Sequence, residues 1–380
     1  MLKIGLLGIG NAGNQIANLA IREGIKTFCI NTSEKDLATV DEAIPVFLFG
    51  EAEGAGKDRS VAKSFVKRHY KDLIGCTDFE HFINETEVVF IAASAGGGTG
   101  SGVSIILTDI LSRVYTNKLF INIGILPTLA ESVGAQRNTL EYFKELKKMD
   151  KPYMLYDNDH YKDLVPSEYM IKVNTEIIND ILYLRGDYNY QSSFGMIDDA
   201  DMFKLLTVPG MLNVSFYEKF MEKDMEEDTK LDSFIIKAMK NNATVTLDKD
   251  RIIKRMGVIV NLSPDLTRYY SPSMETFKAN VGEPFEIFEH YFVNDKADTS
   301  VPNRIAVILA GLSIPDDRIN IILQRIRELE EALAKKKESS VIDQVSSLDS
   351  LKVDSISIDR SRSDEKVDIG SMDFDFLDDY

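Results

Sequence analysis

The chain has 380 residues, which is enough for two packed domains, because a single hydrophobic core stops growing near ~250–300 residues. Hydrophobic residues make up 44% and charged residues 28%, and no apolar run approaches the ~20 residues that cross a bilayer, so the sequence predicts a globular protein without a membrane span. The net charge of −17 argues against direct, broad binding to nucleic acid, which requires a basic face.

The amino terminus and the cysteines predict the cellular compartment. The apolar stretch at residues 2–10 is short, contains Lys3 and runs into glycines, so we expect a buried strand and not a signal peptide. Cys29 and Cys76 lie far apart and form no metal-spaced cluster. We therefore expect a cytoplasmic protein with reduced thiols, no membrane partner and no metal held by protein ligands.

Short apolar runs alternate with amphipathic stretches over the first 160 residues, which is typical of an α/β protein with a parallel sheet. The expected strands are 3–7, 26–30, 44–48, 88–93, 119–125 and 153–156. The expected helices include 14–23, 59–73, 103–114 and 134–149. Parallel sheets of this kind bind ligands at the carboxyl ends of their strands, where the glycine-rich loops of this sequence fall.

The rest of the chain predicts a long helix, a smaller second α/β domain and a tail. Helices are expected at 167–185, 201–206 and 316–337, and strands at 252–260, 288–292 and 305–310. From residue 339 large apolar residues become sparse, so 339–380 is predicted to be a disordered acidic tail. Its last nine residues interleave acidic residues with Phe and Leu, which fits either a solvated end or a short docking motif.

The first glycine loop, Gly-Ile-Gly-Asn-Ala-Gly at 8–13, follows a strand and opens a helix. Its spacing suits a phosphate at a helix N-terminus, and one interpretation is a dinucleotide-binding fold of an NAD-dependent oxidoreductase. That fold needs an acidic residue at the end of the second strand, but the strand ends at Asn31, Thr32 and Ser33, with Glu34 only in the loop beyond. The oxidoreductase therefore remains an alternative with less support.

The second glycine loop, Gly-Gly-Gly-Thr-Gly-Ser-Gly at 96–102, is more specific. Five glycines in seven residues cost backbone entropy, which a simple turn does not require. Consecutive small residues present backbone N–H groups to an anion, and Thr99 and Ser101 add hydroxyl groups. A P-loop requires a Lys followed by Ser or Thr after its glycines. No such pair follows this loop, and Lys57, which follows Gly56, is itself followed by Asp58. The two loops therefore predict a nucleotide held without a P-loop.

These motifs resemble those of the tubulin/FtsZ superfamily of GTPases. The 96–102 loop is similar to the superfamily signature, and the Ala-Gly-Asn-Gln sequence at 12–15 is similar to the first phosphate loop of tubulin. The resemblance implies a GTP-binding domain at 1–166, a central helix region at 167–212, a C-terminal domain with a long helix at 213–338, and the tail at 339–380. It also implies GTP or GDP as ligand, with Mg²⁺.

The resemblance implies specific nucleotide-binding residues in this chain. The phosphate loops contribute Gly10, Asn11, Ala12, Gly13, Asn14, Asn31, Gly96, Gly97, Gly98, Thr99, Gly100 and Ser101. Glu131 and Arg137 match the loop that reaches the ribose, and Asn158 matches an asparagine on the guanine base. Asn179 and Asp180 resemble the base-binding start of the central helix. A possible insertion between Asp180 and Asn213 leaves the position of that base contact open.

The Pro-Gly-Met-Leu-Asn-Val-Ser-Phe-Tyr-Glu segment at 209–218 resembles the synergy loop, which touches the nucleotide of the next subunit. By this resemblance Glu218 orients the attacking water, and Ser215, where the family usually has an acid, makes at most a weak catalytic contribution. GTP hydrolysis then requires head-to-tail assembly of the chain with itself.

Within the superfamily the sequence resembles the divergent TubZ-like proteins of plasmids and phages. The end of the tail lacks the basic, proline-containing motif of a cell-division FtsZ. The resemblance implies filaments that move DNA through a DNA-binding adaptor docked on residues 339–380, which an acidic tail would suit. A phage-type tubulin that positions viral DNA, and an FtsZ-like division protein, remain alternatives.

Overall fold

The computed structural model describes residues 2–50, 54–185, 192–194, 197–218, 244–247, 252–262, 266, 286–293 and 303–338. The predicted tail at 339–380 lies outside these residues, so its disorder and its docking role remain predictions. No helix in the described part of the chain is both long and apolar enough to cross a membrane.

The first half of the chain forms six parallel strands. In spatial order they are β3 (Val46–Leu48), β2 (Lys26–Asn31), β1 (Ile4–Ile9), β4 (Val88–Ser94), β5 (Leu119–Leu126) and β6 (Pro152–Asp157). Nearly every residue of the four inner strands is buried, because helices cover both faces of the sheet. All six strands predicted from the sequence are confirmed, with shifts of one or two residues at their ends.

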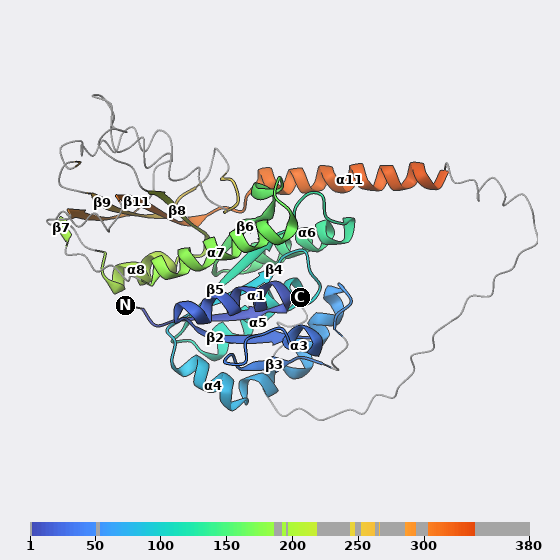
Figure 1. The fold of residues 1–380 in the computed structure, drawn as a ribbon, viewed down its shortest axis with the longest axis horizontal. Coiled ribbons are helices and arrows are strands. Elements are labelled where there is room, and N and C mark those ends of the chain that lie inside the picture. Colours follow the sequence, from blue (N-terminus) through green and yellow to red (C-terminus); the bar gives the residue numbers. More distant parts are fainter. Residues whose placement is uncertain are drawn as a thin grey trace, which may run out of the picture.

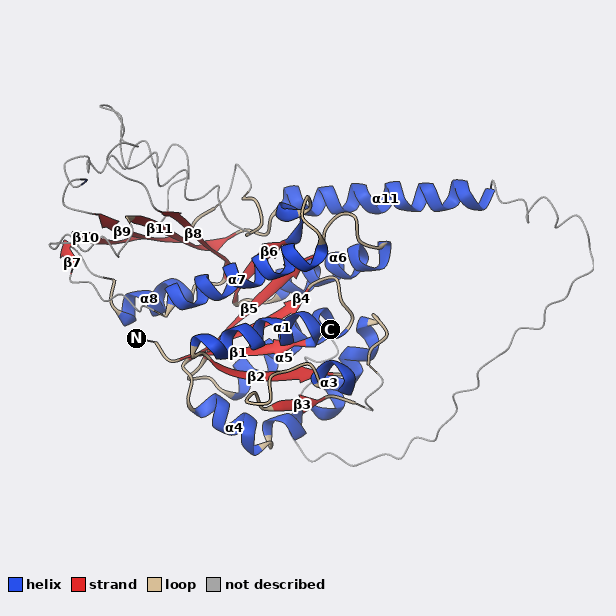
Figure 2. Ribbon diagram, viewed as in Figure 1, coloured by secondary structure: helices blue, strands red, loops and turns tan. Residues whose placement is uncertain are grey.

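Helices form the two outer layers (Figures 1 and 2). The helices and 3-10 turns of this half are α1 (Gly10–Ala20), η1 (Ile21–Glu23), α2 (Glu34–Leu37), α3 (Arg59–Ile74), α4 (Thr77–Asn84), α5 (Thr99–Val114), α6 (Val133–Lys148), η2 (Asn158–Tyr161) and α7 (Pro166–Leu184). Alternate residues of β1 face opposite layers: Leu6 packs in the cluster that contains α1 and α7, and Leu7 packs in the cluster that contains α3, α4 and α5.

The sheet continues beyond β6 into the second half of the chain. Next to β6 come β8 (Gly210–Glu218), β11 (Arg304–Leu312), β9 (Arg255–Leu262), β10 (Glu286–Val293) and β7 (Ser192–Phe194), so the described strands form one eleven-stranded sheet. The strands predicted at 252–260, 288–292 and 305–310 are confirmed. The domain boundaries remain predictions, because a single sheet runs through both halves.

Two helices complete this half of the molecule. The short helix α8 (Asp199–Leu206) packs on β9 and β11. Helix α11 (Asp316–Glu338) lies against α6, with Ile322 and Ile326 buried, and its carboxyl-terminal half extends beyond α6 (Figure 1). The nucleotide-binding loops predicted from the sequence and the first turns of α11 therefore belong to the same side of the molecule.

Candidate functional site

The two glycine loops predicted from the sequence meet at the carboxyl ends of β1 and β4. Gly10 has a φ of +70°, and a β-carbon built on it would lie 3.2 Å from the backbone nitrogen of Gly100. Only glycine fits this conformation and this approach without strain. Helices α1 and α5 consequently begin side by side.

Both helices begin without a capping side chain. Neither Ile9 before α1 nor Gly98 before α5 makes a side-chain cap, and neither first turn contains an acidic residue. The first N–H groups of a helix have no partner within the helix and attract anions, aided by the helix dipole. Two such ends in contact form a site suited to a polyphosphate.

Close packing accounts for most glycines of the 96–102 loop. A β-carbon on Gly98 would lie 2.6 Å from Cα of Lys57, and one on Gly102 would lie 2.8 Å from the carbonyl oxygen of Arg59. Gly96 and Gly100 have neighbours at 3.1 Å. Only Gly97 has open space, with its nearest neighbour at 3.8 Å. The structure thus adds a packing requirement to the anion-binding role predicted for these glycines.

Side chains around the two helix starts join the loops. The hydroxyl oxygens of Thr32 and Thr99 lie 2.7 Å apart, which links the loop after β2 to α5. Ser101 is fully buried and its hydroxyl donates to the carbonyl oxygen of Gly97, so this hydroxyl holds the loop. In the same region Asn11 is exposed, Ala12 is half-buried and Gly13 is buried.

Two buried amides at this edge have one end unpaired. Asn31 accepts hydrogen bonds from the N–H groups of Thr32 and Ser33, but no described group accepts from its buried Nδ2. Asn14 donates to the carbonyl oxygen of Asp36 at 3.4 Å, and no described group donates to its buried Oδ1. Buried polar atoms are nearly always paired, so these two atoms indicate places for a ligand.

The loop after β5, predicted to reach a ribose, is held by several hydrogen bonds. Glu131 accepts from the N–H of Thr128 at 3.1 Å, and burial raises the pKa of its carboxyl group while that hydrogen bond opposes the rise. The N–H of Leu129 donates to Asp159 at 3.0 Å. Arg137 does not join this group: it is exposed and forms an ion pair with Glu330 of α11, and its ribose contact remains a prediction.

Asn158 begins η2 directly after β6 and is buried, which suits the base contact predicted for it. The preceding residue, Asp157, forms a buried ion pair with Arg318 of α11, which also donates to the carbonyl oxygen of Pro127. Arg318 was missed in the sequence because it lies far from the glycine loops in the chain. The available signal was its position one turn before Ile322, on the apolar face of the expected helix.

The predicted base contacts at Asn179 and Asp180 are wrong in position. Helix α7 begins at Pro166, so these residues lie in its last two turns and not at its start. Asn179 is exposed, and Asp180 is buried and accepts a hydrogen bond of 2.6 Å from Tyr156. The buried polar residues in the first turns of α7 are Tyr169 and Asn174, each 7% exposed. The helix-starting Pro166 was the sequence signal for this assignment.

The segment at 209–218, predicted as a loop, is the strand β8 from Gly210 onward. It pairs with β6 only at Gly210 and Met211, and Thr244 forms the bridge to Tyr156 farther along β6. These two pairs lie at the amino end of β6, whereas the phosphate loops lie at the carboxyl ends of the parallel strands. Strand β8 therefore separates from β6 before it reaches the edge of the sheet that carries those loops. A single chain therefore does not bring Ser215 or Glu218 to its own glycine loops.

The two predicted catalytic residues differ in surroundings. Ser215 is fully buried and donates to Oδ1 of Asn213 at 2.7 Å, so its hydroxyl is part of the core and its predicted catalytic contribution is not supported. Glu218 is about one third exposed and forms an ion pair with Arg304, its partner in the β8–β11 register. Glu218 alone remains accessible to a second molecule.

Comparison with known proteins shows which proteins the chain resembles. Residues 3–166 match the model of the Tubulin/FtsZ family, GTPase domain. The tubulin-like protein TubZ of Clostridium botulinum C phage is 26% identical over 348 residues, which cover 90% of this chain and 89% of that protein. Cell division protein FtsZ 1 of Pyrococcus woesei is 24% identical over 220 residues, 56% of this chain and 54% of that protein.

A solved structure shows the same fold. The GTPγS-form protofilament of TubZ from Bacillus thuringiensis serovar israelensis superimposes with a TM-score of 0.73 at 16% identity, and covers 89% of this chain and 94% of that one. The family match over residues 3–166 favours the tubulin/FtsZ interpretation of the glycine loops over the oxidoreductase alternative. Residues 3–166 thus match the Tubulin/FtsZ family, GTPase domain, and the chain has the tubulin/FtsZ-like fold.

Proposed function

We propose that this chain binds GTP where α1 and α5 begin, hydrolyses it to GDP and phosphate, and assembles head to tail with itself. The contact between Gly10 and Gly100 carries the proposal, because it sets two uncapped helix starts against one anion site. The family match over residues 3–166 supports GTP as the nucleotide. Asn158, with Tyr169 and Asn174 in place of Asn179 and Asp180, would contact the base.

The residues at this site fit a Mg²⁺ ion that is held mainly by the phosphates. Groups of three or more His, Cys, Asp or Glu side chains placed to hold a metal are absent from the described residues. Oxygen atoms are nevertheless available, from the hydroxyls of Thr32 and Thr99 and from the unpaired Oδ1 of Asn14. Mg²⁺ prefers oxygen ligands and keeps several waters, and when bound it would neutralise charge on the phosphates.

Hydrolysis would be completed by a second copy of the chain. Phosphoryl transfer needs a group that orients the attacking water, and the described residues of the glycine loops include no carboxylate for this task. Glu218 lies on β8, away from its own phosphate loops, and is the carboxylate we propose for the neighbour's site. Protofilaments formed by the Bacillus TubZ support this arrangement.

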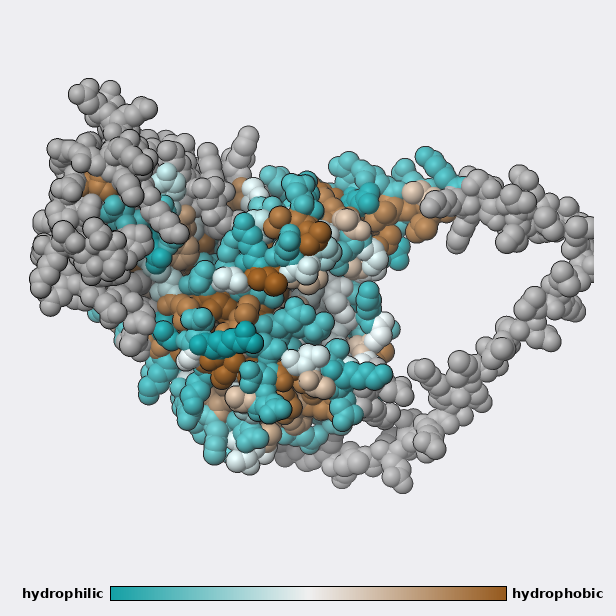
Figure 3. Space-filling model, in the orientation of Figure 1, coloured by the Kyte–Doolittle hydropathy of each residue, from teal (hydrophilic) through white to brown (hydrophobic). Residues whose placement is uncertain are grey.

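An exposed apolar surface borders the nucleotide edge and would suit such a contact. Leu164 and Val165 precede α7, and Met170 and Ile171 lie in its first turns; they are 38–64% exposed. Figure 3 shows apolar side chains among polar ones on the face that carries α1 and α7. Apolar groups gathered next to a site commonly mark a protein interface.

GTP turnover as a function of protein concentration tests this proposal. If a second copy completes the site, the rate per molecule should be near zero in dilute protein and rise above a threshold concentration. Glu218→Gln should lower the assembled rate about 100-fold or more, the range for removing a residue that acts on a proton in the reaction. Glu85→Gln is the matched control, since Glu85 also forms an exposed ion pair, with Lys26. A rate per molecule independent of concentration would contradict the proposal.

We further propose that the filament moves plasmid or phage DNA in the cytoplasm through a DNA-binding adaptor that docks on residues 339–380. The phage TubZ matches 90% of this chain, whereas the FtsZ relative matches 56%, and the net charge of −17 disfavours direct contact with DNA. A chain ending at residue 338 should assemble with GTP but not bind the adaptor. Loss of assembly on truncation would instead favour a tail that makes filament contacts, as in the phage-positioning alternative.

A further inference from the structure

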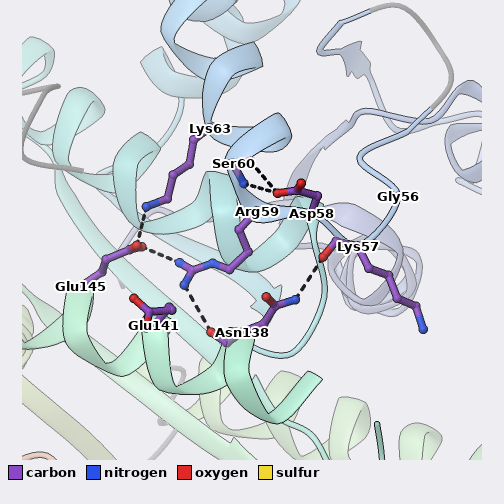
Figure 4. A pocket seen from close by; sticks show the side chains of 9 residues that line it. All are labelled: Gly56, Lys57, Asp58, Arg59, Ser60, Lys63, Asn138, Glu141 and Glu145. Atoms are coloured by element: carbon purple, nitrogen blue, oxygen red, sulfur yellow. Dashed lines mark hydrogen bonds and ion pairs between the residues drawn. The ribbon is translucent and has the colours of Figure 1, made fainter. Parts of the chain in front are cut away.

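A polar network lies behind the 96–102 loop, between the start of α3 and the middle of α6. It borders a cavity of about 510 Å³ whose wall includes Lys57, Arg59, Lys63, Asn138 and Glu145 (Figure 4). Neither the glycine motif nor the family resemblance assigns a role to Arg59 or Asn138. Both nevertheless contact the backbone of the phosphate loop directly.

Asn138 contacts three carbonyl oxygens. Its Nδ2 lies 3.1 Å from the carbonyl oxygen of Gly96, 3.4 Å from that of Gly97 and 3.2 Å from that of Lys57. The first two belong to the glycine loop and the third to the loop before α3. One carboxamide thus joins two loops that are far apart in sequence.

These contacts determine which way the loop's N–H groups point. In a planar trans peptide the C=O and the following N–H point in opposite directions. When Asn138 holds the carbonyls of Gly96 and Gly97 on its own side, the N–H groups of Gly97 and Gly98 face the other way. Successive N–H groups on one side of a loop form an anion-binding concavity.

Arg59 supports the same loop from its other end. Its Nη2 donates to the carbonyl oxygen of Ser101 at 2.9 Å, and its Nη1 donates to the carbonyl oxygen of Asn138 at 3.3 Å. Arg59 is buried and is held by Glu145 at 2.6 Å, which also pairs with Lys63 at 2.5 Å. Because a buried charge needs a partner, Glu145 keeps the guanidinium in place under the loop.

The loop before α3 is tied to the same network. Lys57 has a φ of +63°, an uncommon backbone conformation for a residue with a side chain, and its backbone packs against Gly98. A hydrogen bond from Asn138 to the carbonyl oxygen of Lys57 holds this conformation. A movement of either loop therefore changes the contacts of the other.

We propose that Asn138 and Arg59 are positioning residues for the nucleotide: they hold the glycine loop from behind so that the N–H groups of Gly97 and Gly98 face the phosphates. This inference rests on GTP binding at that loop, as proposed above. It assigns to α3 and α6 an indirect part in phosphate binding, through the backbone of the glycine loop. Neither side chain itself touches the phosphates.

Two substitutions of Asn138 separate positioning from packing. Asn138→Asp keeps the shape of the side chain but turns a carboxylate toward three carbonyl oxygens, whereas Asn138→Ala removes volume without adding repulsion. We expect Asn138→Ala to bind GTP about tenfold more weakly than the wild type, and Asn138→Asp more weakly still. If packing alone mattered, the order would be reversed, because aspartate preserves the volume.

Calorimetric titration of the full chain with GTP and GDP, together with melting of the nucleotide-free protein, completes the test. Glu141→Gln is the control: it lies on α6 beside the same cavity, is exposed and pairs with Lys144, so its affinity should equal that of the wild type. If the Asn138 variants fail to fold, Arg59→Lys serves instead. Lysine retains the charge beside Glu145 but cannot reach the carbonyl oxygens of both Ser101 and Asn138. We expect this variant to bind GTP about fivefold more weakly than the wild type.

The outcomes distinguish this inference from the proposed function. Failure of the wild type to bind GTP would contradict the proposed function itself. Binding by the wild type, with unchanged affinity in Asn138→Ala and Asn138→Asp or with the reversed order, would overturn only the positioning role. An unchanged melting temperature without nucleotide, together with a smaller rise on adding GTP, would support it.

Discussion

Arg318 of α11 and Asp157 at the end of β6 form a buried ion pair, with each side chain 7% exposed. Nε of Arg318 lies 2.7 Å from Oδ2 of Asp157, and Nη2 donates to Oδ1 at 2.9 Å. The same Nη2 donates to the carbonyl oxygen of Pro127 at 3.1 Å. Helix α11 thus holds the two loops that carry the proposed ribose contact, Glu131, and the proposed base contact, Asn158.

Removing the cation from this pair should destabilise the protein. Arg318→Met leaves the carboxylate of Asp157 buried without a countercharge, which typically costs about 3–5 kcal/mol, although the N–H of Asp159 still donates to it. The double variant Arg318→Met with Asp157→Asn removes both charges and should recover part of that loss. Urea unfolding of the wild type, the two single variants and the double variant measures the effect. Equal stability of Arg318→Met and the wild type would contradict the pairing.

A second arginine of α11 allows a test of nucleotide binding. Nε of Arg325 donates to the carbonyl oxygen of Leu129 at 3.0 Å, whereas Arg327 is exposed on the same helix. Arg325→Gln should weaken GTP and GDP binding by a similar factor of about five, the value of one hydrogen bond, because both nucleotides carry the ribose that this loop would contact. Arg327→Gln should have no effect. Equal affinities of the two variants, measured by titration, would contradict a role of Arg325 in nucleotide binding.

Neighbouring glycines of the phosphate loop should respond differently to alanine. A β-carbon at position 98 would lie 2.6 Å from Cα of Lys57, so Gly98→Ala forces backbone apart and should cost about 1–3 kcal/mol. At Gly97 the space is open, and Gly97→Ala should change the stability of the nucleotide-free protein by less than about 0.5 kcal/mol. Thermal or urea unfolding without nucleotide compares them, and equal losses would be inconsistent with this packing.

Asp180 should make stability depend on pH. Burial raises the pKa of its carboxyl group well above the usual value, although the hydrogen bond from Tyr156 opposes the rise. The folded protein therefore retains a proton that the unfolded chain releases, and stability falls as the pH rises above the unfolded pKa of about 4. Asp180→Asn should flatten this decline and be more stable than the wild type at pH 8. Asp163→Asn, an exposed carboxylate before α7, is the control, and unfolding at pH 5 to 8 is the measurement.

Local patterns were sufficient to predict the parallel sheet and both glycine loops. The strands from β1 to β6 are mostly apolar; Gly10 follows β1 directly, and the 96–102 loop follows β4 after Ala95. The long helix α7 was also expected. Here the apolar residues and the required glycines lie within a few positions of one another, so the physical cause is contained in a short segment.

Contacts between distant segments account for what was missed. Arg318 and Asp157 are 161 positions apart, and nothing near either residue indicates the other. Asn179 and Asp180 were assigned by resemblance to the start of the central helix, but α7 begins at Pro166, well before them. That segment forms β8 because β11 offers it an antiparallel partner, with Glu218 opposite Arg304.

A mixing experiment tests the central claim, that one copy holds the nucleotide and the next supplies Glu218. Glu218→Gln keeps an intact nucleotide face. Gly97→Asp keeps Glu218 but adds a carboxylate where the phosphates would bind, and the open space at Gly97 accommodates that side chain. Gly97→Asn is the uncharged control for Gly97→Asp. Each variant alone should hydrolyse GTP slowly, and an equimolar mixture should recover a substantial part of the wild-type rate. A mixture no faster than the average of its two components would contradict a site shared between copies.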